Sequence, residues 1–597
     1  MSLTRPTEGE EIADWSREGP PRSRRHGDVY FSAEDGLAES RAVFLAGCGL
    51  PEAWRGRSRF CVAELGFGTG LNIAALLESW RLTASPDARL HVFTVENDLI
   101  TAAEAARALA RWPELSETAG ALVSHWPGRA RGFRRIQLPQ FGATIDLAQL
   151  EAGEALQAWS GAADAWFLDG FSPSADPLIW RPKVLSLVAK RSRPGARAAS
   201  FTVAGAVRRG LAEAGFEVRR EPGHGRKRER LEAWLPGVAE ESAARRIAVV
   251  GAGIAGASVC RALAAQNIAA TLLDVRRPRA SAVPAAIAGP RLDAGLGPIA
   301  ALFAQAAARA TALYEAVPGA VFARGVLQLA VGPKDVSRFE TVVASDLFEP
   351  GWLDLLEADD AAAWVGEPCG RALHLRGALA IDPAPVLAAW APVPLDGEVA
   401  RIERAGTLWR IEDAQGETLC EADAVCVAAG AATSNLLEGV ELTAVRGQAT
   451  LALDVEAPAL SFGAYVSPAP GGALFGATHE RDDRDIAPRS DDDARNLRSV
   501  TTVLPRLGER LARASLQSWT GVRAATADYL PLAGAIPRQD GLFVLTGLGS
   551  RGFCLAPLLG EHLASQMAGL PSPLPLPLGV LLDPGRFAAR RRRRATR

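Results

Sequence analysis

Two glycine-rich segments have the residue types and spacing that could bind a nucleotide-like ligand. The first is ELGFGTGLN, Glu64–Asn72, and the second is GAGIAG, Gly251–Gly256; each directly follows an apolar run. Glycine at the end of a strand lets the backbone turn tightly and approach a ligand without interference from a Cβ atom. The segments differ in sequence and in the acids around them, so they predict two different ligands.

In the first segment, acidic residues surround the glycines. Glu64 leads into a loop that contains Gly66, Gly68 and Gly70, and a leading carboxylate suits a cationic or zwitterionic ligand better than a pyrophosphate. Glu96 ends the next predicted strand, 26 residues after Gly70, where a carboxylate can accept hydrogen bonds from a ribose diol. The pattern favours a site for S-adenosylmethionine, and a structural tight turn is the alternative.

Asp169 follows another predicted strand, Ala163–Leu168, and begins the segment DGFSPSADPLIW. A carboxylate at the carboxyl edge of a parallel sheet lies over the ligand crevice. Methyl transfer to an amine needs a neutral nucleophile in line with the sulfonium, and a nearby carboxylate can take the surplus proton. We therefore expect Asp169 to be catalytic; a helix cap or an Asx turn before the prolines is the alternative.

The second segment has the spacing of a dinucleotide-binding loop. A predicted strand, Ile247–Val250, runs into Gly251, Gly253 and Gly256, and Asp274 ends the next strand 18 residues after the last glycine. These residues would supply a tight turn, close approach of a pyrophosphate, helix packing and a hydrogen bond to ribose.

NAD and FAD share this loop, and two later stretches favour FAD. Asp423–Gly430 is an apolar strand that ends in glycine, and Leu542–Ala556 combines a strand, a glycine-rich turn and the start of a helix. Such a helix N-terminus could stabilise negative charge on a reduced flavin. The glycine-rich turn could also be a simple loop.

The elements around these segments predict two α/β domains. Short β-rich runs alternate with helical stretches in the first third, which predicts a parallel sheet with helices on both faces. The pattern breaks in the polar stretch 236–246, so we place a domain boundary near residue 240. Beyond residue 570, a proline-rich run and an arginine-rich end predict an extended tail.

Composition narrows the class of protein. A chain of 597 residues exceeds one core, and its seven scattered cysteines never form a CxxC pair, which argues against a disulfide framework or a zinc site. We see no leader-like apolar segment and no apolar run of about 20 residues, so we expect a cytoplasmic enzyme without a bound metal. The basic stretches Arg17–Arg25, Arg208–Arg230 and Arg590–Arg597 could contact phosphates or be solvated faces.

Further motifs carry a resemblance to a known family. In the first part they are DVYFSAEDGLAESRAVFLAG, DAWFLDGFSPSADPLIW, FTVAGAVRRGL and GHGRKRE; in the second they are RGVLQLA, RGQAT, FGATHERDDRD, GVRAATADYLPLAG and GLGSRGFCLAPLLGEHLA. Together with the two glycine loops, and in this order, they resemble the bifunctional tRNA 5-methylaminomethyl-2-thiouridine biosynthesis proteins. The resemblance covers nearly the whole chain.

The resemblance implies a fold and a two-step reaction. Residues 1–240 would be a Rossmann-like class I methyltransferase, and residues 245–570 an FAD-binding Rossmann domain with an inserted α+β substrate subdomain, like glycine and D-amino-acid oxidases; the extended basic tail would be 571–597. The second domain would oxidise the carboxymethylaminomethyl group of a tRNA wobble uridine and release the aminomethyl form. The first would then methylate that amine with S-adenosylmethionine.

The resemblance also implies site residues. Asp169 would lie beside the acceptor amine. The methyl donor would be held by Glu64, Gly66, Gly68, Gly70, Asn72, Glu96 and Asp146. FAD would be held by Gly251, Gly253, Gly256 and Asp274, with Gly549, Ser550 and Arg551 nearer its ring. Arg226, Lys227 and Arg228 would contact tRNA.

The chain departs from the family pattern in one stretch near the expected flavin site. Arg279–Ala285 reads RASAVPA, where the family has a Gly-Ala-Ser-Gly-Asn type of run. Two further departures, Asp176 and His224, lie outside the glycine and acid framework. The first change leaves open a methyltransferase with a degenerate flavin domain. A small-molecule amine oxidase fused to a metabolite methyltransferase is a further alternative.

Overall fold

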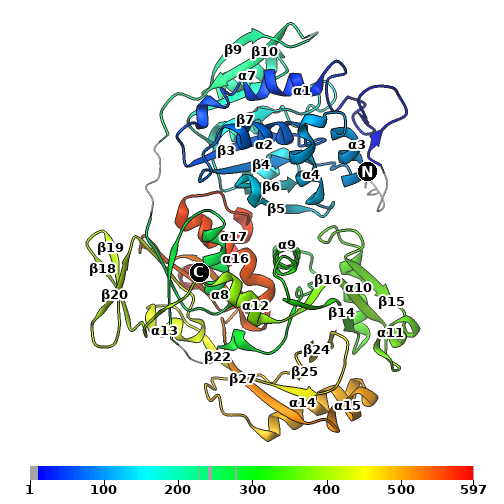
Figure 1. The fold of residues 1–597 in the computed structure, drawn as a ribbon, viewed down its shortest axis with the longest axis vertical. Coiled ribbons are helices and arrows are strands. Elements are labelled where there is room, and N and C mark those ends of the chain that lie inside the picture. Colours follow the sequence, from blue (N-terminus) through cyan, green and yellow to red (C-terminus); the bar gives the residue numbers. More distant parts are fainter. Residues whose placement is uncertain (1–10, 226, 240–244, 276–278, 596–597) are drawn as a thin grey trace. The chain divides into compact units, whose positions relative to one another are not determined.

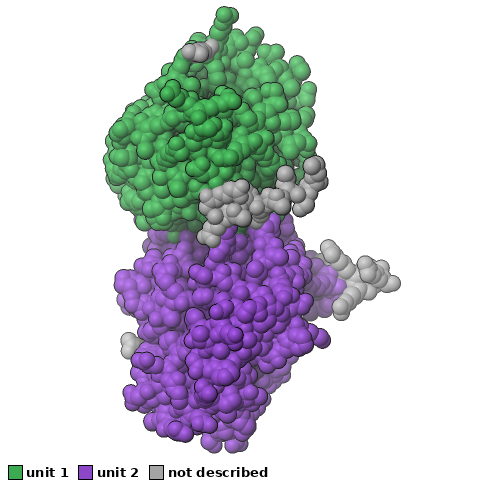
Figure 2. Space-filling model, turned by 90° about the vertical axis from the view of Figure 1, so that its right-hand side faces the viewer, with its two compact units in different colours: residues 1–242 green, residues 243–597 purple. Residues whose placement is uncertain are grey.

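The computed structural model describes residues 11–225, 227–239, 245–275 and 279–595. The chain divides into two compact units, Met1–Ser242 and Ala243–Arg597, which Figure 2 colours separately. Each unit has its own sheets and its own hydrophobic cores. Among the described residues, no helix has both the length and the apolar character needed to cross a membrane.

The first unit is built on an eight-stranded sheet in the order β5-β6-β4-β3-β7-β8-β10-β9 (Figure 1). Five neighbouring strands are parallel: β6 (Ala143–Gln149), β4 (Arg89–Val95), β3 (Arg59–Leu65), β7 (Ala163–Leu168) and β8 (Ser192–Ser200). They bring the ends of β3, β4 and β7, which carry the predicted site, to one edge of the sheet.

The prediction of a purely parallel sheet is wrong at both edges. β5 (Gly132–Leu138) pairs antiparallel with β6, and β10 (Glu229–Trp234) pairs antiparallel with both β8 and β9 (Glu217–Pro222). A short turn joins β9 to β10, and strands joined so closely can pair only in the antiparallel sense.

Helices cover both faces of this sheet. They are α2 (Leu71–Thr83), α3 (Ala102–Leu109), α4 (Ser116–Ser124), α5 (Ala152–Ala158), α6 (Pro182–Lys190) and α7 (Gly205–Glu213). Alternate residues of β3 enter different cores: Phe60 and Val62 pack in one, and Cys61 and Ala63 in the other. A strand that is apolar on both faces is expected in the middle of such a sheet.

Shorter elements precede the sheet in the chain. They are β1 (Ala13–Asp14), β2 (Arg22–Ser23), α1 (Gly36–Glu39) and the π-helical turn Ser40–Leu45. Asp35 caps α1 by accepting hydrogen bonds from the backbone N–H groups of Leu37 and Ala38. The cap fixes where α1 begins, and with it the positions of Glu39 and Ser40.

The second unit contains a six-stranded sheet in the order β17-β12-β11-β21-β29-β28. Its parallel strands are β17 (Leu395–Asp396), β12 (Ala270–Asp274), β11 (Ile247–Val250), β21 (Ala424–Val427) and β29 (Leu542–Thr546), and β28 (Leu532–Ala535) is antiparallel. Strands from residues 247 and 542 thus belong to one sheet. Helices α8 (Ile254–Ala264), α9 (Pro298–Glu315) and α16 (Gly552–Ala568) pack around a shared core.

A second layer of strands is inserted between β12 and β29. Its sheet contains β13 (Ala286–Ala288), β14 (Val321–Leu329), β15 (Leu353–Leu356), β16 (Ala372–Ile381), β22 (Thr443–Leu453), β23 (Leu460–Ser461), β24 (Tyr465–Ala469), β25 (Gly472–Gly476), β26 (Glu480–Arg481) and β27 (Leu516–Ala525). The helices of this region are α10 (Pro333–Val343), α11 (Ala358–Val365), α12 (Pro383–Trp390), α13 (Thr433–Leu436), α14 (Ser490–Val503) and α15 (Pro505–Ala512). A small sheet of β18 (Arg401–Ala405), β19 (Leu408–Glu412) and β20 (Thr418–Ala422) completes the unit. This arrangement confirms the inserted α+β subdomain.

The prediction of an extended C-terminal tail is wrong. The segment forms α17 (Leu576–Leu582) and α18 (Arg586–Ala595). Leu574, Leu578 and Leu582 are buried in the core beside α16, and the buried Arg586 pairs with Asp528 at 2.8 Å. The proline-rich composition conceals these leucines, whose spacing of four residues matches one turn of a helix.

Candidate active sites

In the first unit, the glycine loop lies against the end of β7. The φ angles of Gly66 and Gly68 are 90° and 54°, which favour glycine. A Cβ atom on Gly66 would lie 1.9 Å from the backbone oxygen of Asp169, so any side chain there would push the two loops apart. The glycine requirement at Gly66 is therefore a close approach of two backbones.

A chain of hydrogen bonds links the acids of this site through Asn72. The Asn72 amide nitrogen donates to Asp169 at 2.7 Å and to Glu64 at 3.2 Å, while its oxygen accepts from the Ser40 hydroxyl at 2.7 Å. Glu64 also accepts from Thr94 at 2.7 Å and is fully buried, and burial raises its pKa. Glu64 thus helps to fix Asn72, which in turn bonds Asp169.

Glu96 connects the glycine loop to the next strand. One oxygen accepts from the backbone N–H of Gly68 at 3.0 Å and the other from that of Asp98 at 2.9 Å. Burial raises the pKa of Glu96 although both hydrogen bonds oppose this rise. The carboxylate thus lies at the carboxyl end of β4, beside the loop.

Asp169 has the electrostatic character of a proton acceptor. Burial raises the pKa of its carboxyl to about 7, and Glu39 adds to the rise, while the hydrogen bond from Asn72 and the charge of Lys227 oppose it. A carboxylate whose pKa lies near neutrality can accept a proton from an ammonium group and release it to solvent. The alternatives of a cap or an Asx turn leave this bond to Asn72 unexplained.

The expectation that Asp146 contacts the methyl donor is wrong. Asp146 lies inside β6, is 1% exposed, and receives two hydrogen bonds of 2.7 Å from Arg135 and one contact of 3.0 Å from His91. Arg135 and His91 hold the pKa of Asp146 far below its usual range against the effect of burial. An acid with both oxygens occupied inside a sheet belongs to its core.

Gln149, three residues further, was missed. It ends β6 at the same edge as Glu96, it is buried, and among the described residues its side-chain oxygen has no hydrogen-bond partner. A buried acceptor without a partner at a ligand crevice fits a contact with the bound molecule. The sequence signal for Gln149 was its position at the end of a strand. Because glutamine is uncharged, it did not stand out as a site residue there.

The predicted tRNA contacts lie on the turn between β9 and β10. Arg226 is outside the described residues, and Arg228 is exposed. Lys227 instead contacts Glu39, with 2.8 Å between Nζ and the carboxylate, and its Nζ lies 4.1 Å from the centre of the Phe201 ring. The structure thus places Lys227 between Glu39 and Phe201.

In the second unit, the predicted dinucleotide loop forms as expected. A Cβ atom on Gly256 would lie 1.8 Å from the Gly251 oxygen, so α8 packs against the loop only with glycine there. Asp274 accepts a hydrogen bond from the backbone N–H of Ala252 at 3.0 Å. The other Asp274 oxygen pairs with Arg279.

The run Arg279–Ala285, which departs from the family pattern, contacts this loop region. Its residues Ala280–Ala282 form a 3₁₀ turn, and the Ser281 hydroxyl accepts from the backbone N–H of Ile254 at 3.0 Å. Ser281 thus lies at the N-terminus of α8, where a pyrophosphate would bind. The changed residues keep a polar group at this position.

One continuous cavity of about 910 Å³ extends from the dinucleotide loop into the inserted subdomain. It is lined by the predicted Gly251, Gly253, Asp274, Gly549, Ser550 and Arg551, and also by Ser281, Tyr465, His479 and Arg523. Gly256 is absent from the lining because it packs α8 against the loop. The cavity and the residues of the dinucleotide loop that line it fit FAD.

Arg523, Tyr465 and His479 were missed and mark the substrate end of the cavity. Arg523 donates to the Thr478 oxygen at 2.8 Å, and its other terminal nitrogen lies 3.1 Å from Nε2 of His479. Burial lowers the pKa of Arg523 and raises that of Tyr465 to about 12. A half-buried arginine that lines a cavity can bind a carboxylate. The sequence signal for Arg523 was a single charged residue among the small residues of GVRAA, which form the end of β27.

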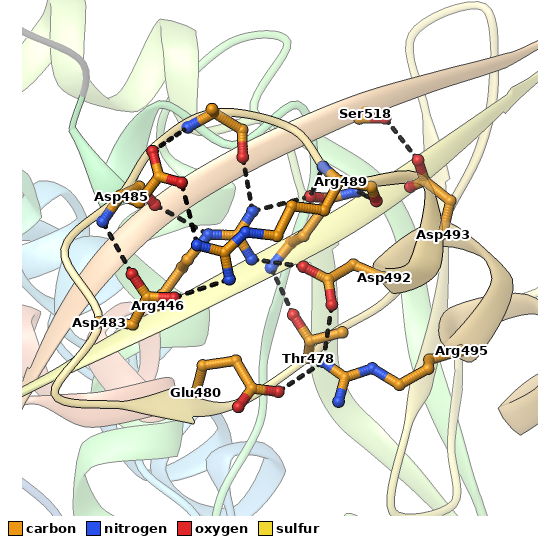
Figure 3. Close-up of polar contacts among 12 residues, drawn as sticks. Arg446, Thr478, Glu480, Asp483, Asp485, Arg489, Asp492, Asp493, Arg495 and Ser518 are labelled. Carbon is orange, nitrogen blue, oxygen red and sulfur yellow. Dashed lines mark hydrogen bonds and ion pairs between the residues drawn. The ribbon is translucent and has the colours of Figure 1, made fainter.

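A buried ion network supports this end of the cavity (Figure 3). Arg446 is fully buried and pairs with the Asp492 carboxylate. It also donates hydrogen bonds to the backbone oxygens of Asp485 at 2.8 Å and of Ala487 at 2.7 Å. The neighbouring Gln448 donates its backbone N–H to the Thr478 hydroxyl at 3.0 Å. Arg446 therefore fixes the loop that follows β26, beside the residue that anchors Arg523.

Comparison with known proteins assigns the same two activities. Residues 113–236 match the family described as S-adenosyl-L-methionine-dependent methyltransferase, and residues 246–566 match the family described as FAD dependent oxidoreductase. The fold and the two sites thus define a methyltransferase fused to an FAD-dependent oxidoreductase.

Similar curated proteins share the whole length of the chain. The chain is 55% identical to the tRNA 5-methylaminomethyl-2-thiouridine biosynthesis bifunctional protein MnmC of Caulobacter sp. (strain K31), over 96% of this chain and 97% of that protein. The protein of the same name from Maricaulis maris (strain MCS10) is 42% identical, over 98% and 97%. The chain belongs to the MnmC family.

Two solved structures are similar to part of the chain. The glycine oxidase from Geobacillus kaustophilus is 24% identical with a TM-score of 0.47, over 55% of this chain and 95% of that chain. The iminodiacetate oxidase from Chelativorans sp. BNC1 is 23% identical with a TM-score of 0.49, over 55% and 97%.

Proposed function

We propose that this protein modifies the wobble uridine of tRNA in two steps. The oxidoreductase unit removes the carboxymethyl group from 5-carboxymethylaminomethyl-2-thiouridine, and the methyltransferase unit converts the resulting aminomethyl group to 5-methylaminomethyl-2-thiouridine. The names of the relatives support this substrate, and so does the order of the chemistry. The first step makes an amine, and the second site holds a carboxylate suited to an amine.

In the oxidative step, a C–N bond next to a carboxylate is broken. The N–CH₂ unit loses two electrons and two protons to become an imine, and water then adds and splits the C–N bond into a primary amine and a two-carbon aldehyde acid. FAD, when bound, supplies the two-electron acceptor. Arg523 would bind the carboxylate and so orient the N–CH₂ unit toward the ring, with Tyr465 and His479 beside it.

In the methylation step, the acceptor arrives as an ammonium ion and must lose a proton. S-adenosylmethionine supplies the methyl group when bound. Asp169 would accept the proton, and Asn72 would hold the carboxylate in place. Glu96, the glycine loop and the side-chain oxygen of Gln149 would hold the adenosine part of the donor.

The partner we propose is tRNA, and the location is the cytoplasm. Arg228 is exposed on the turn between β9 and β10 and would contact phosphate. The described cysteines are free thiols, which suits a reducing compartment.

The observation that carries the proposal is the pairing of two complementary sites in one chain. A cavity lined by the half-buried Arg523 lies in one unit, and a carboxylate of near-neutral pKa at the end of a strand lies in the other. A cavity of about 910 Å³ lined by Gly251, Gly253 and Asp274 supports a working flavin domain over a degenerate one.

The test is mass spectrometry of tRNA that carries the carboxymethylaminomethyl group. With FAD and S-adenosylmethionine we expect the methylaminomethyl nucleoside, and with FAD alone the aminomethyl nucleoside. Unchanged tRNA in both reactions would refute the proposal. Turnover of free amino acids such as sarcosine, without an effect of tRNA, would support the small-molecule alternative.

A further inference from the structure

A charge pair beside Asp169 has no part in the functions described so far. Glu39 ends α1, and its carboxylate lies 2.8 Å from Nζ of Lys227 on the turn between β9 and β10. The Glu39 side chain is 12% exposed and that of Lys227 is 45% exposed. Two segments far apart in the sequence thus meet through this ion pair.

The pair is built into the same cluster as Asp169. Ser40, next to Glu39, donates to Asn72 at 2.7 Å, and Asn72 donates to Asp169 at 2.7 Å. On the other side, the Lys227 ammonium lies 4.1 Å from the centre of the Phe201 ring, just beyond β8. A cation between a carboxylate and an aromatic face is held in one place.

The identity of the cation is itself informative. The chain has four lysines among its 66 basic residues, so arginine supplies nearly all of its positive charge. Arginine serves phosphate recognition well, whereas the compact ammonium of lysine fits a small space between a carboxylate and a ring. Lys227 is therefore poorly explained as one more phosphate contact.

We propose that Lys227 and Glu39 are positioning residues of the methyl-transfer step, which hold opposite charges beside Asp169 and so set when it accepts the proton of the acceptor amine. The inference rests on the proposed function of the methyltransferase unit. The charged and titratable groups that act on Asp169 are Glu39 from α1, Lys227 from the turn and Glu64 from β3, with Asn72 from α2 as the hydrogen-bond donor.

The two members of the pair have opposite effects. Glu39 raises the pKa of Asp169, and Lys227 lowers it. Methylation needs the ionised carboxylate, so activity rises with pH through the pKa of Asp169. Loss of the Lys227 charge moves this rise to higher pH, and loss of the Glu39 charge moves it to lower pH.

The experiment compares the pH dependence of kcat/KM for methylation of aminomethyl-tRNA in wild type, Lys227→Met and Glu39→Gln. We expect shifts of the acid limb by about half a pH unit or more, in opposite directions. Lys183→Met, which removes an exposed lysine on α6 of the same unit, is the matched control and leaves the limb in place.

The salt dependence of tRNA binding separates this role from a phosphate contact. Loss of one phosphate contact reduces the slope of log Kd against log salt by about 1. We expect the slope of Lys227→Met to equal that of wild type. A reduced slope together with an unmoved acid limb would overturn the inference.

A measurement without tRNA keeps the test independent of the proposed function. The Asp169 carboxyl can be titrated by NMR in protein with ¹³C-labelled aspartate, with Asp169→Asn for assignment. Opposite shifts in the two variants would support the charge pair even if wild type methylates no tRNA, and that second result would count against the proposed function alone. Identical titrations in all three proteins would refute the pair.

Discussion

At the scale of single residues, the two reactions depend on one carboxylate and one guanidinium. Asp169 lies at the end of β7 and accepts a hydrogen bond from Asn72. Arg523 lies in β27, donates a hydrogen bond to the backbone oxygen of Thr478 and contacts His479. Burial shifts the pKa of both side chains toward the neutral form. Each side chain therefore gains more free energy from contact with an oppositely charged substrate group than an exposed side chain would.

We predict that Asp169→Asn lowers kcat/KM for methylation by about a hundredfold or more while oxidation of the carboxymethylaminomethyl group is unchanged. The amide keeps the shape of the side chain but cannot accept the proton. In wild type, methylation should fall as the pH drops below about 7, because the carboxyl is then protonated. Equal loss of both activities in a folded variant would contradict the division of roles.

We predict that Arg523→Met raises KM for the oxidative step by about ten- to a hundredfold, because a hydrogen-bonded charge pair with the substrate carboxylate is lost. Methylation of aminomethyl-tRNA should be unchanged. Steady-state kinetics of both steps checks this. Arg513→Met, which removes an 80% exposed arginine of the same unit, is the control and should leave both steps as in wild type; an Arg523→Met protein with a normal KM would exclude the carboxylate contact.

At the scale of elements, two loops of the second unit are fixed by tightly packed residues. The glycine loop before α8 tolerates no side chain at Gly256, and the loop after β26 is fixed by the fully buried Arg446. These constraints are properties of packing between elements. Their loss should affect one unit and spare the other.

We predict that Gly253→Val prevents FAD binding, because the larger side chain fills the space beside Ser281 where the pyrophosphate would lie; a Cβ atom there is already 3.3 Å from the Ser281 oxygen. The absorbance of bound flavin in the purified protein measures this. Methylation of tRNA that already carries the aminomethyl group should continue. Full flavin content in the variant would contradict the placement of the cofactor.

We predict that Arg446→Met destabilises the second unit by about 3–5 kcal/mol, because the buried Asp492 loses its buried partner and keeps only the partly exposed Arg495. Urea unfolding followed through the flavin signal measures this. The matched control is Arg489→Met, which breaks partly exposed pairs with Asp483 and Asp485 and should cost about 1 kcal/mol or less. Equal losses in both variants would show that burial of Arg446 has no special effect.

At the scale of the whole molecule, the chain consists of two units that each have their own cores and a complete site. All residues that line the oxidoreductase cavity come from the second unit, and the described groups around Asp169 come from the first. Among the described residues, neither site includes a residue from the other unit. The intermediate must therefore reach the second site as a tRNA that carries a primary amine.

We predict that a mixture of the Asp169→Ala and Gly253→Val proteins completes the conversion that each fails to complete alone. One protein supplies aminomethyl-tRNA, and the other methylates it. Mass spectrometry of the nucleosides gives the readout, with each single variant as the control. Accumulation of the aminomethyl form in the mixture would show that the intermediate passes between sites within one molecule.

The sequence by itself determined the two nucleotide loops, the order of their strands and the acids at the strand ends, including Asp169, Glu96 and Asp274. These features are local: a glycine turn needs positive φ or close backbone approach, and strand periodicity is written in neighbouring residues. It also predicted the inserted subdomain, through the family resemblance of motifs such as GVRAATADYLPLAG.

Only the tertiary structure decided which charged residues share a site. Asp146 looked like a ligand, but the adjacent β5 brings Arg135 to it inside the sheet. Lys227 looked like a phosphate contact, but the antiparallel pairing of β10 places its turn beside Glu39, 188 residues earlier. The physical reason is that the pKa and the partner of a side chain depend on groups brought close by packing, and sequence spacing does not record that distance.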